Sequence, residues 1–368
     1  GGVAGRTRVV VGRMIRIFLA GGLATLVSLV GTKYLIDALT RMKVGQPIHE
    51  DAPEGHTVKA GTPTMGGIAI VVAAVVSYVV SGFYRGIYTQ RGLFVVLAIA
   101  GAGFVGFLDD FIKIVKQRSL GLRSKAKMVG QTVIALTFGL LATSPMLENA
   151  DHPTPASLHI SFLRDIPAIT LPMIVVIVFI WGIVAGFSNG MNLTDGLDGL
   201  ATGASVMVFG AYTLVNIWQR NQACGPVPSA RCYDVRDPLD LAVVSAAITG
   251  ACFGFLWWNA SPAAIFMGDT GSLALGGSLA GLAVLTRTEL LLVVLGGLFV
   301  VETLSVMLQV GFFKLSKGRR IFRMAPLHHH FEMLGWDQVT VVIRFWIITG
   351  LCVAAGLGIF YAEWVAGT

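Results

Sequence analysis

Five aspartates are the residues of this chain best suited to catalysis, because they interrupt a background that is otherwise apolar. Asp109 and Asp110 are adjacent, Asp195 and Asp198 lie three residues apart, and Asp269 stands before a long apolar run. A carboxylate at membrane depth is costly and is usually functional. Two close carboxylates repel unless a cation lies between them, and oxygen ligands with few His or Cys nearby favour Mg²⁺. We therefore predict a magnesium site with Asp269 as a ligand and Asp109 or Asp110 as further candidates.

The stretch 189–200, N-G-M-N-L-T-D-G-L-D-G-L, holds two of these aspartates together with Asn192. If a helix starts here, Asp195 and Asp198 point to one side of it and Thr194 caps it. Glycines in the stretch allow a ligand to come close, and free N–H groups at a helix start favour an anion. The stretch is predicted to form a polar pocket at a membrane edge.

Two further segments carry candidate binding residues. Asn259 and Phe266 precede Asp269, and Phe266 has the flat ring needed to stack on a base, although packing is the commoner role of an aromatic residue in a membrane protein. Capping of the following helix is the alternative role of Asp269. Lys59 and Thr64 lie in a Pro- and Gly-rich turn before an apolar run, where backbone donors can meet an anion. The turn lacks the Lys-Ser/Thr ending of a P-loop.

Three consecutive histidines, His328, His329 and His330, occupy a loop rich in Lys and Arg. Consecutive residues cannot all face one zinc ion, and no Cys is near, so a zinc site is disfavoured. Phosphate recognition or acid-base chemistry fits the run better. The basic residues 317–320 favour a lipid-facing positive cluster.

The composition places these residues in a membrane protein. Of 368 residues, 55% are hydrophobic and 13% are charged, which excludes an ordinary soluble globule. We expect ten helices of about 20 residues each, near 14–39, 64–84, 92–112, 127–146, 169–190, 197–218, 239–258, 270–286, 289–313 and 340–363. The predicted fold is all-α, with residues 1–368 forming one transmembrane domain. Residues 1–13 form its N-terminal tail, whose opening Gly1-Gly2 resembles an added remnant, and no cleavable signal is expected.

An even number of spans places both termini on one face and gathers the five aspartates and the three histidines on the other. More of the 27 Lys and Arg residues lie on the face of the aspartates, so the positive-inside rule places that face in the cytoplasm. Arginines near the N-terminus argue against this orientation.

The four cysteines form two groups. Cys252 and Cys352 lie in apolar runs and are expected to be packing residues. Cys224 and Cys232 share one polar loop, where a disulfide and two free thiols are both open, because spacing alone does not establish a bridge.

Five motifs together resemble the phospho-N-acetylmuramoyl-pentapeptide transferases, the translocase I family of the polyprenyl-phosphate N-acetylhexosamine-1-phosphate transferase superfamily. They are G-T-P-T-M-G-G at 61–67, F-L-D-D-F at 107–111, N-L-T-D-G-L-D-G-L at 192–200, F-M-G-D-T-G-S at 266–272 and F-R-M-A-P-L-H-H-H-F-E at 322–332. The similarity runs in order from about Lys59 to Phe345. The N-terminal tail and the outer loops have no match.

The resemblance implies a ten-helix protein of the bacterial inner membrane, with periplasmic termini, a cytoplasmic active site, Mg²⁺ dependence and a homodimer. It also implies the reaction, in which phospho-MurNAc-pentapeptide passes from its UDP carrier to undecaprenyl phosphate, giving lipid I and UMP for peptidoglycan synthesis, cell shape and cell division.

By the same resemblance, Asp109 is the catalytic base or phosphate-side acid, Asp110 assists it, and Asp269 is the Mg²⁺ ligand. The nucleotide side of the pocket is assigned to Lys59, Thr64, Asn192, Asp195, Asp198, Asn259 and Phe266. Gln309, His328, His329 and His330 are placed near the sugar or diphosphate, with His328 counted as catalytic. Lys113 and either Lys125 or Lys127 are the phosphate candidates, with Lys125 preferred.

Three other functions remain open at this point. A GlcNAc-1-phosphate type of prenyl-phosphate transferase shares the aspartate motifs and differs chiefly in the histidine loop. A transporter needs charged groups at mid-bilayer and often inverted repeats, neither of which is visible. An intramembrane aspartyl protease needs paired aspartates inside its spans, whereas these lie at span ends.

Overall fold

The fold consists almost entirely of helices. A computed structural model describes residues 2–42, 61–84, 88–116, 121–147, 154–224 and 232–366. The helices are α1 Gly2–Arg41, α2 Gly67–Gly82, α3 Gln90–Val115, α4 Ser124–Ala142, α5 Met173–Thr194, α6 Leu200–Asn221, α7 Pro238–Asn259, α8 Gly268–Leu285, α9 Glu289–Leu295, α10 Gly297–Leu315, α11 Leu327–Glu332 and α12 Gln338–Ala366. A short antiparallel hairpin pairs β1 His159–Ser161 with β2 Asp165–Thr170.

Seven helices in the described part of the chain are long and apolar enough to cross a membrane, and α2 is a shorter apolar helix of 16 residues. This confirms an all-α polytopic membrane protein. The predicted number of ten spans stays a prediction.

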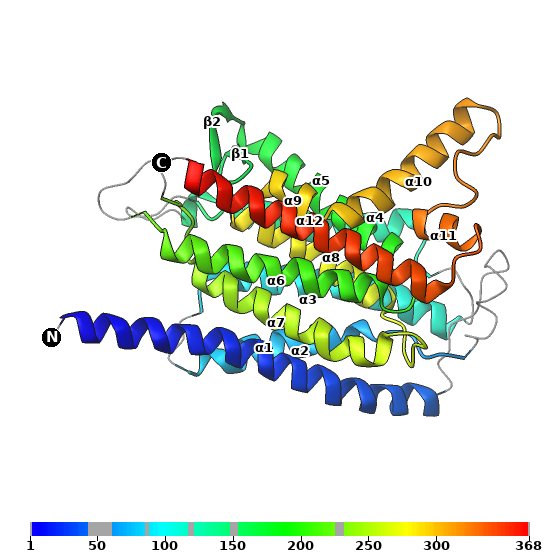
Figure 1. The fold of residues 1–368 in the computed structure, drawn as a ribbon, viewed down its shortest axis with the longest axis horizontal. Coiled ribbons are helices and arrows are strands. Elements are labelled where there is room, and N and C mark those ends of the chain that lie inside the picture. The colour runs from blue at the N-terminus through cyan, green and yellow to red at the C-terminus, as the bar shows by residue number, and fades with distance from the viewer. Residues whose placement is uncertain are drawn as a thin grey trace.

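The helices run side by side along the long axis of the molecule, and both chain termini lie at the same end (Figure 1). The C-terminal ends of α3, α5 and α7 lie at the opposite end, as does the segment between α10 and α12. We call the first end the terminus end and the second the site end. The expectation that both termini share one face is therefore consistent with this arrangement.

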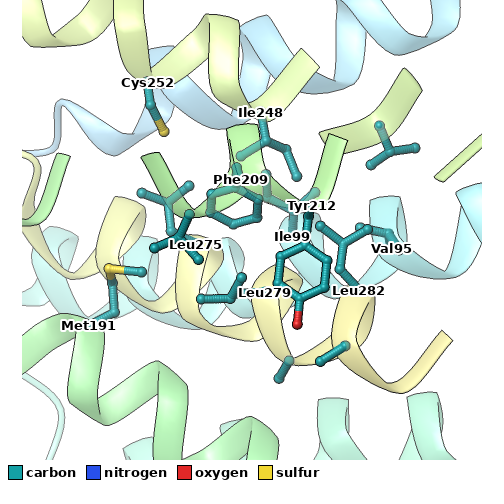
Figure 2. Packing of buried hydrophobic residues seen from close by; sticks show 14 of the residues in the cluster. Val95, Ile99, Met191, Phe209, Tyr212, Ile248, Cys252, Leu275, Leu279 and Leu282 are labelled. Atoms are coloured by element: carbon teal, nitrogen blue, oxygen red, sulfur yellow. The ribbon is translucent and has the colours of Figure 1, made fainter. Parts of the chain in front are cut away.

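Helix α8 lies at the centre of the bundle and is buried from Asp269 to Leu285. Its leucines Leu275, Leu279 and Leu282 lie among side chains of the surrounding helices, including Phe209 of α6 (Figure 2). Elsewhere along α8, the backbones of neighbouring helices come close to its own backbone, with no large side chain between them. A Cβ atom at Gly106 of α3 would overlap the backbone carbonyl of Asp269, so this glycine lets α3 touch α8 directly.

Several elements differ from the sequence-based expectation. Helix α1 begins at Gly2, so residues 2–13 are helical, and the candidate membrane span within this helix begins at Met14. The predicted span 289–313 is broken at Gly296, where α9 ends and α10 begins. The β-hairpin was not predicted, since its strands are short and only partly buried.

At the terminus end, one buried carboxylate ties four elements together. Asp240 of α7 accepts hydrogen bonds from Tyr78 Oη at 2.7 Å and from Thr89 Oγ1 at 2.8 Å. Its other oxygen lies 2.9 Å from Nη1 of Arg16. Because α1, α2, α3 and α7 all contribute, this network fixes the relative position of these helices.

Cys224 and Cys232 form a disulfide just after α6, whose C-terminal end lies at the terminus end (Figure 1). Cys252 is buried and Cys352 is partly buried, and both are free thiols. The structure therefore resolves the pairing that the spacing of the cysteines left open.

Candidate active site

The ends of α3 and α8 bring three carboxylates together at the site end. One oxygen each from Asp109, Asp110 and Asp269 lies within 4.8 Å of the others. All three side chains are largely buried, with Asp269 the most exposed at 8%. The even number of predicted spans placed these three residues on one face, and in the structure they do lie together.

Asp110 anchors the first turn of α8. Its carboxylate accepts hydrogen bonds from the backbone N–H of Asp269 at 3.2 Å, and from the backbone N–H and hydroxyl of Thr270 at 2.9 and 2.7 Å. A carboxylate at a helix N-terminus satisfies free donors and complements the helix dipole. Asp110 thus fixes Asp269 relative to α3, and capping, which was the alternative role of Asp269, is carried out by Asp110.

Asp109 points to the other side of the α3 terminus. One of its oxygens accepts the backbone N–H of Leu122 at 2.8 Å, and the other lies 2.7 Å from Nζ of Lys113, one helical turn on. The contact with Leu122 connects α3 to the start of the segment that leads into α4.

Asp269 is held between two ammonium groups. Its Oδ2 lies 2.8 Å from Nζ of Lys113 and 2.8 Å from Nζ of Lys127, while its Oδ1 accepts a hydrogen bond from the amide of Asn192. Lys113 also lies 3.5 Å from Asp110. Lys125, the lysine preferred from the sequence, is exposed, and Lys127 is the one that contacts the cluster. Three carboxylates share two lysines here, which leaves one negative charge uncompensated among these five side chains.

Backbone pairing places Thr64 next to this cluster. The N–H groups of Gly66 and Gly67 donate to the carbonyls of Phe266 and Met267 at 2.9 and 2.8 Å, so the turn at 61–67 and the segment before α8 hold each other. Gly268 has φ of +71°, and a Cβ atom there would contact Asp110 and Thr64. Lys59 lies outside the described residues.

The stretch 189–200 differs from the predicted helix start. Helix α5 continues to Thr194, whose hydroxyl donates to Gly190 O at 2.8 Å, and α6 begins only at Leu200. Thr194 is therefore not an N-cap. Asp195 and Asp198 lie in the turn between two helices, beside the carboxylate cluster.

Asp195 is electrostatically coupled to that cluster. Burial raises the pKa of Asp195 well above its usual range, and the negative charges of Asp269 and Asp110 raise it further, while a hydrogen bond from the backbone of Gly268 opposes the rise. Asp198 is buried and accepts the backbone N–H of Ala263 at 3.2 Å.

Asn259 and Phe266 flank the loop between α7 and α8. Asn259 is buried, accepts a hydrogen bond from Thr202 at 2.7 Å and donates to Ile265 O at 3.0 Å. Its amide therefore shapes the loop that presents Phe266, which is only partly buried.

The histidine run forms the short helix α11, and its members differ in environment. His328 is completely buried, with Nδ1 3.2 Å from Oε2 of Glu302. His329 Nδ1 lies 2.6 Å from Glu332, and His330 Nδ1 accepts the backbone N–H of Arg323 at 3.1 Å. Both of these rings are partly exposed.

Gln309, predicted near the sugar or diphosphate, holds the loop that precedes α11. Its Oε1 accepts the N–H groups of Ile321 and Phe322, and its Nε2 donates to Phe322 O. All three bonds are to the backbone of the loop.

Two residues of the site were not identified from the sequence. Thr270 follows Asp269 directly and appeared only as part of a motif. Glu302 is a single acid in the apolar run of α10, and an isolated charge in a predicted span is itself a signal of function.

The chain is similar to known proteins over almost its whole length. Residues 92–287 match the family model described as glycosyl transferase family 4, and residues 59–71 match phospho-N-acetylmuramoyl-pentapeptide-transferase signature 1. A phospho-N-acetylmuramoyl-pentapeptide-transferase of Nocardioides sp. is 67% identical over 363 residues, covering 96% of this chain and all of the relative. Proteins of the same name from Cutibacterium acnes and Streptomyces griseus are each 57% identical, over 96% of this chain and 100% and 99% of the relatives.

Proposed function

Since the chain belongs to the phospho-N-acetylmuramoyl-pentapeptide transferases, within glycosyl transferase family 4, we propose that it joins phospho-MurNAc-pentapeptide to undecaprenyl phosphate. An oxygen of the lipid phosphate forms a bond to the phosphorus attached to the sugar of UDP-MurNAc-pentapeptide. The bond from that phosphorus to the UMP oxygen breaks, so that lipid I and UMP are the products.

The observation that carries the proposal is the cluster of Asp109, Asp110 and Asp269 with Lys113 and Lys127 at one end of an apolar bundle. Both substrates are phosphate anions that repel each other, and phosphoryl transfer is chiefly a matter of positioning and charge neutralisation. A site at the membrane boundary lets the lipid tail stay in the bilayer while the UDP-sugar remains in water.

The carboxylates fit a magnesium ion. Three buried Asp side chains with oxygens within 4.8 Å of one another supply the hard ligands that Mg²⁺ prefers, and their charge exceeds that of the two lysines. Asp269 and Asp109 are the ligands proposed, because Asp110 is already committed to the backbone of α8. When bound, the ion supplies electrostatic stabilisation of the diphosphate.

The remaining residues of the site bind and orient the substrates. Lys113 and Lys127 neutralise phosphate charge. The turn with Asp195 and Asp198 and the loop with Asn259 and Phe266 form the nucleotide side. Asp109 is proposed to act on the lipid phosphate, as a base or as a nucleophile in a two-step route. Trapping a phospho-enzyme that Asp109→Asn abolishes would support two steps, and inversion at phosphorus would exclude them.

We propose further that the protein is a multi-pass protein of the bacterial inner membrane with the site end in the cytoplasm, acting as a homodimer. The excess of Lys and Arg on that face supports the orientation. The disulfide between Cys224 and Cys232 at the terminus end supports it too, because disulfides persist in oxidising compartments.

The test is incubation of the purified protein with UDP-MurNAc-pentapeptide and undecaprenyl phosphate, with and without Mg²⁺, while UMP release is followed. We expect release that requires both substrates and the ion. UDP-GlcNAc in place of UDP-MurNAc-pentapeptide tests the alternative substrate class. A folded protein that releases no UMP from the muramoyl substrate would refute the assignment.

A further inference from the structure

Glu302 is a buried carboxylate of α10 to which the proposed reaction gives no role. Its side chain has no exposed surface, and its Oε2 accepts the backbone N–H of Leu327 at 2.9 Å. The same oxygen lies 3.2 Å from Nδ1 of His328. A carboxylate inside a membrane-spanning helix is costly to keep and is functional by default, so the partners of Glu302 indicate its role.

His328 connects Glu302 to the nucleotide side of the site. Its ring is fully buried, and within the described residues neither ring nitrogen makes a well-formed hydrogen bond. The Nε2 side of the ring lies against Gly196, where a Cβ atom would overlap it. Gly196 is the residue between Asp195 and Leu197 in the turn that joins α5 to α6, so the ring fills the space directly behind that turn.

Helix α10 therefore holds the 321–328 segment at two points. Gln309 lies seven residues after Glu302, two helical turns along the same face. Gln309 binds the backbone at Ile321 and Phe322, and Glu302 binds it at Leu327. Of these two contacts, only the one made by Glu302 is connected to the turn with Asp195 and Asp198, because Glu302 also contacts His328, which lies against Gly196.

We propose that Glu302 is a positioning residue which, through His328, fixes the Asp195–Asp198 turn and thereby sets the affinity for the nucleotide part of the UDP substrate. His328 is then also a positioning residue that does not touch the substrates, in contrast to the catalytic role expected from its motif. This inference rests on the proposed function, because it assigns the nucleotide part of the proposed substrate to the Asp195–Asp198 turn.

Glu302→Gln is the first test. The amide oxygen of Gln retains an acceptor for Leu327 N–H, so the loop stays attached while the charge facing His328 is removed. We expect the KM for UDP-MurNAc-pentapeptide and the Kd for UMP to rise about tenfold, as for other supporting residues one step removed from a ligand. The KM for undecaprenyl phosphate is expected to remain within about twofold.

Glu289→Gln is the matched control, because Glu289 is another buried acid on the same broken helix, at α9. It makes the same Glu-to-Gln exchange at a buried position far from the turn and should leave both KM values unchanged. Equal effects of the two substitutions, or an unchanged affinity for UMP in Glu302→Gln, would overturn the proposal.

Gly196→Ala tests the same contact from the opposite side without changing any charge, and it decides the question if Glu302→Gln does not fold. The added methyl group displaces the His328 ring, so we expect the same selective loss of UMP affinity. Gly186→Ala in α5 is the control, since a Cβ atom there meets nothing within 4 Å. The double variant Glu302→Gln/Gly196→Ala should be little worse than either single variant, because both break one connection. Fully additive losses would contradict a shared route.

Binding of UMP to the unsubstituted protein separates this inference from the proposed function. If that protein does not bind UMP, the proposed function itself fails. If it binds UMP and the Glu302 and Gly196 variants bind it equally well, only the positioning role is wrong.

Discussion

Both ends of the helix bundle contain a network around buried aspartates, but the network around Asp240 has equal positive and negative charge and the site-end cluster does not. At the terminus end, Asp240 faces one guanidinium, Arg16, and its remaining acceptor capacity is taken up by Tyr78 and Thr89. At the site end, Asp109, Asp110 and Asp269 share Lys113 and Lys127. A pair with equal and opposite charges is a structural connection, whereas an excess of negative charge is a place for a cation.

The donors at the two ends differ as well. Asp240 receives side-chain donors from three helices and so ties them together. The site-end carboxylates receive several backbone donors, at Leu122, Asp269 and Thr270, which fixes their positions around the shared ammonium group of Lys113. The Asp240 network therefore connects helices, whereas the site-end cluster has the excess of negative charge that the proposed reaction requires.

Asp269→Asn should have the largest effect on activity. The substitution keeps the size of the side chain but removes the charge that Lys113 and Lys127 face. We expect UMP release to fall about 10³-fold, which is the order of loss when one electrostatic element of an active site is removed. The thermal midpoint of the detergent-solubilised protein should change little. Retention of more than a tenth of the activity would remove Asp269 from the proposed chemistry.

Asp240→Ala should act in the opposite way, on stability and not on chemistry. It leaves Arg16 buried without its carboxylate, and breaking a buried pair in this manner costs about 3 kcal/mol or more. Unfolding by heat or denaturant should therefore occur at clearly milder conditions, with UMP release per folded molecule close to that of the unsubstituted protein. A stable Asp240→Ala protein with low activity would mean that the terminus end takes part in the reaction.

Lys127→Ala and Lys125→Ala sharpen the comparison within the site end. Lys127 contacts Asp269, so its loss should lower kcat/KM about 30-fold, in line with truncating one partner of a buried charge pair. Lys125 is exposed on the same helix, and its loss should have a smaller effect. The reverse ranking would support the preference for Lys125 drawn from the sequence.

The sequence predicted the class of fold and the meeting of the aspartates, because both depend on coarse properties. Apolar runs of about 20 residues give the membrane helices, and an even number of runs brings Asp109, Asp110 and Asp269 to one face. The choice between Lys125 and Lys127 depends on which side of α4 faces α8. The sequence of a basic segment does not give this orientation.

Other features depend on contacts between distant residues and were missed for that reason. Arg16 is one of the arginines near the N-terminus that enter the positive-inside argument, yet it is buried against Asp240, 224 positions further along the chain. The break between α9 and α10 was also missed, because a Gly-Gly pair is common in membrane helices. Glu302 was overlooked as a lone acid in the predicted span 289–313, and its contact with His328 follows from the path of the loop that returns to α10.

The complete burial of α8 has a consequence for how this protein changes over evolutionary time. A helix that faces lipid on one side, such as α1, has positions where one apolar residue replaces another freely. Helix α8 has no such side from Asp269 to Leu285, and it touches α3 through backbone at Gly106. Sequence drift in α8 is therefore confined to exchanges of nearly equal volume, and the aspartate at its start is carried by a helix with little freedom to vary.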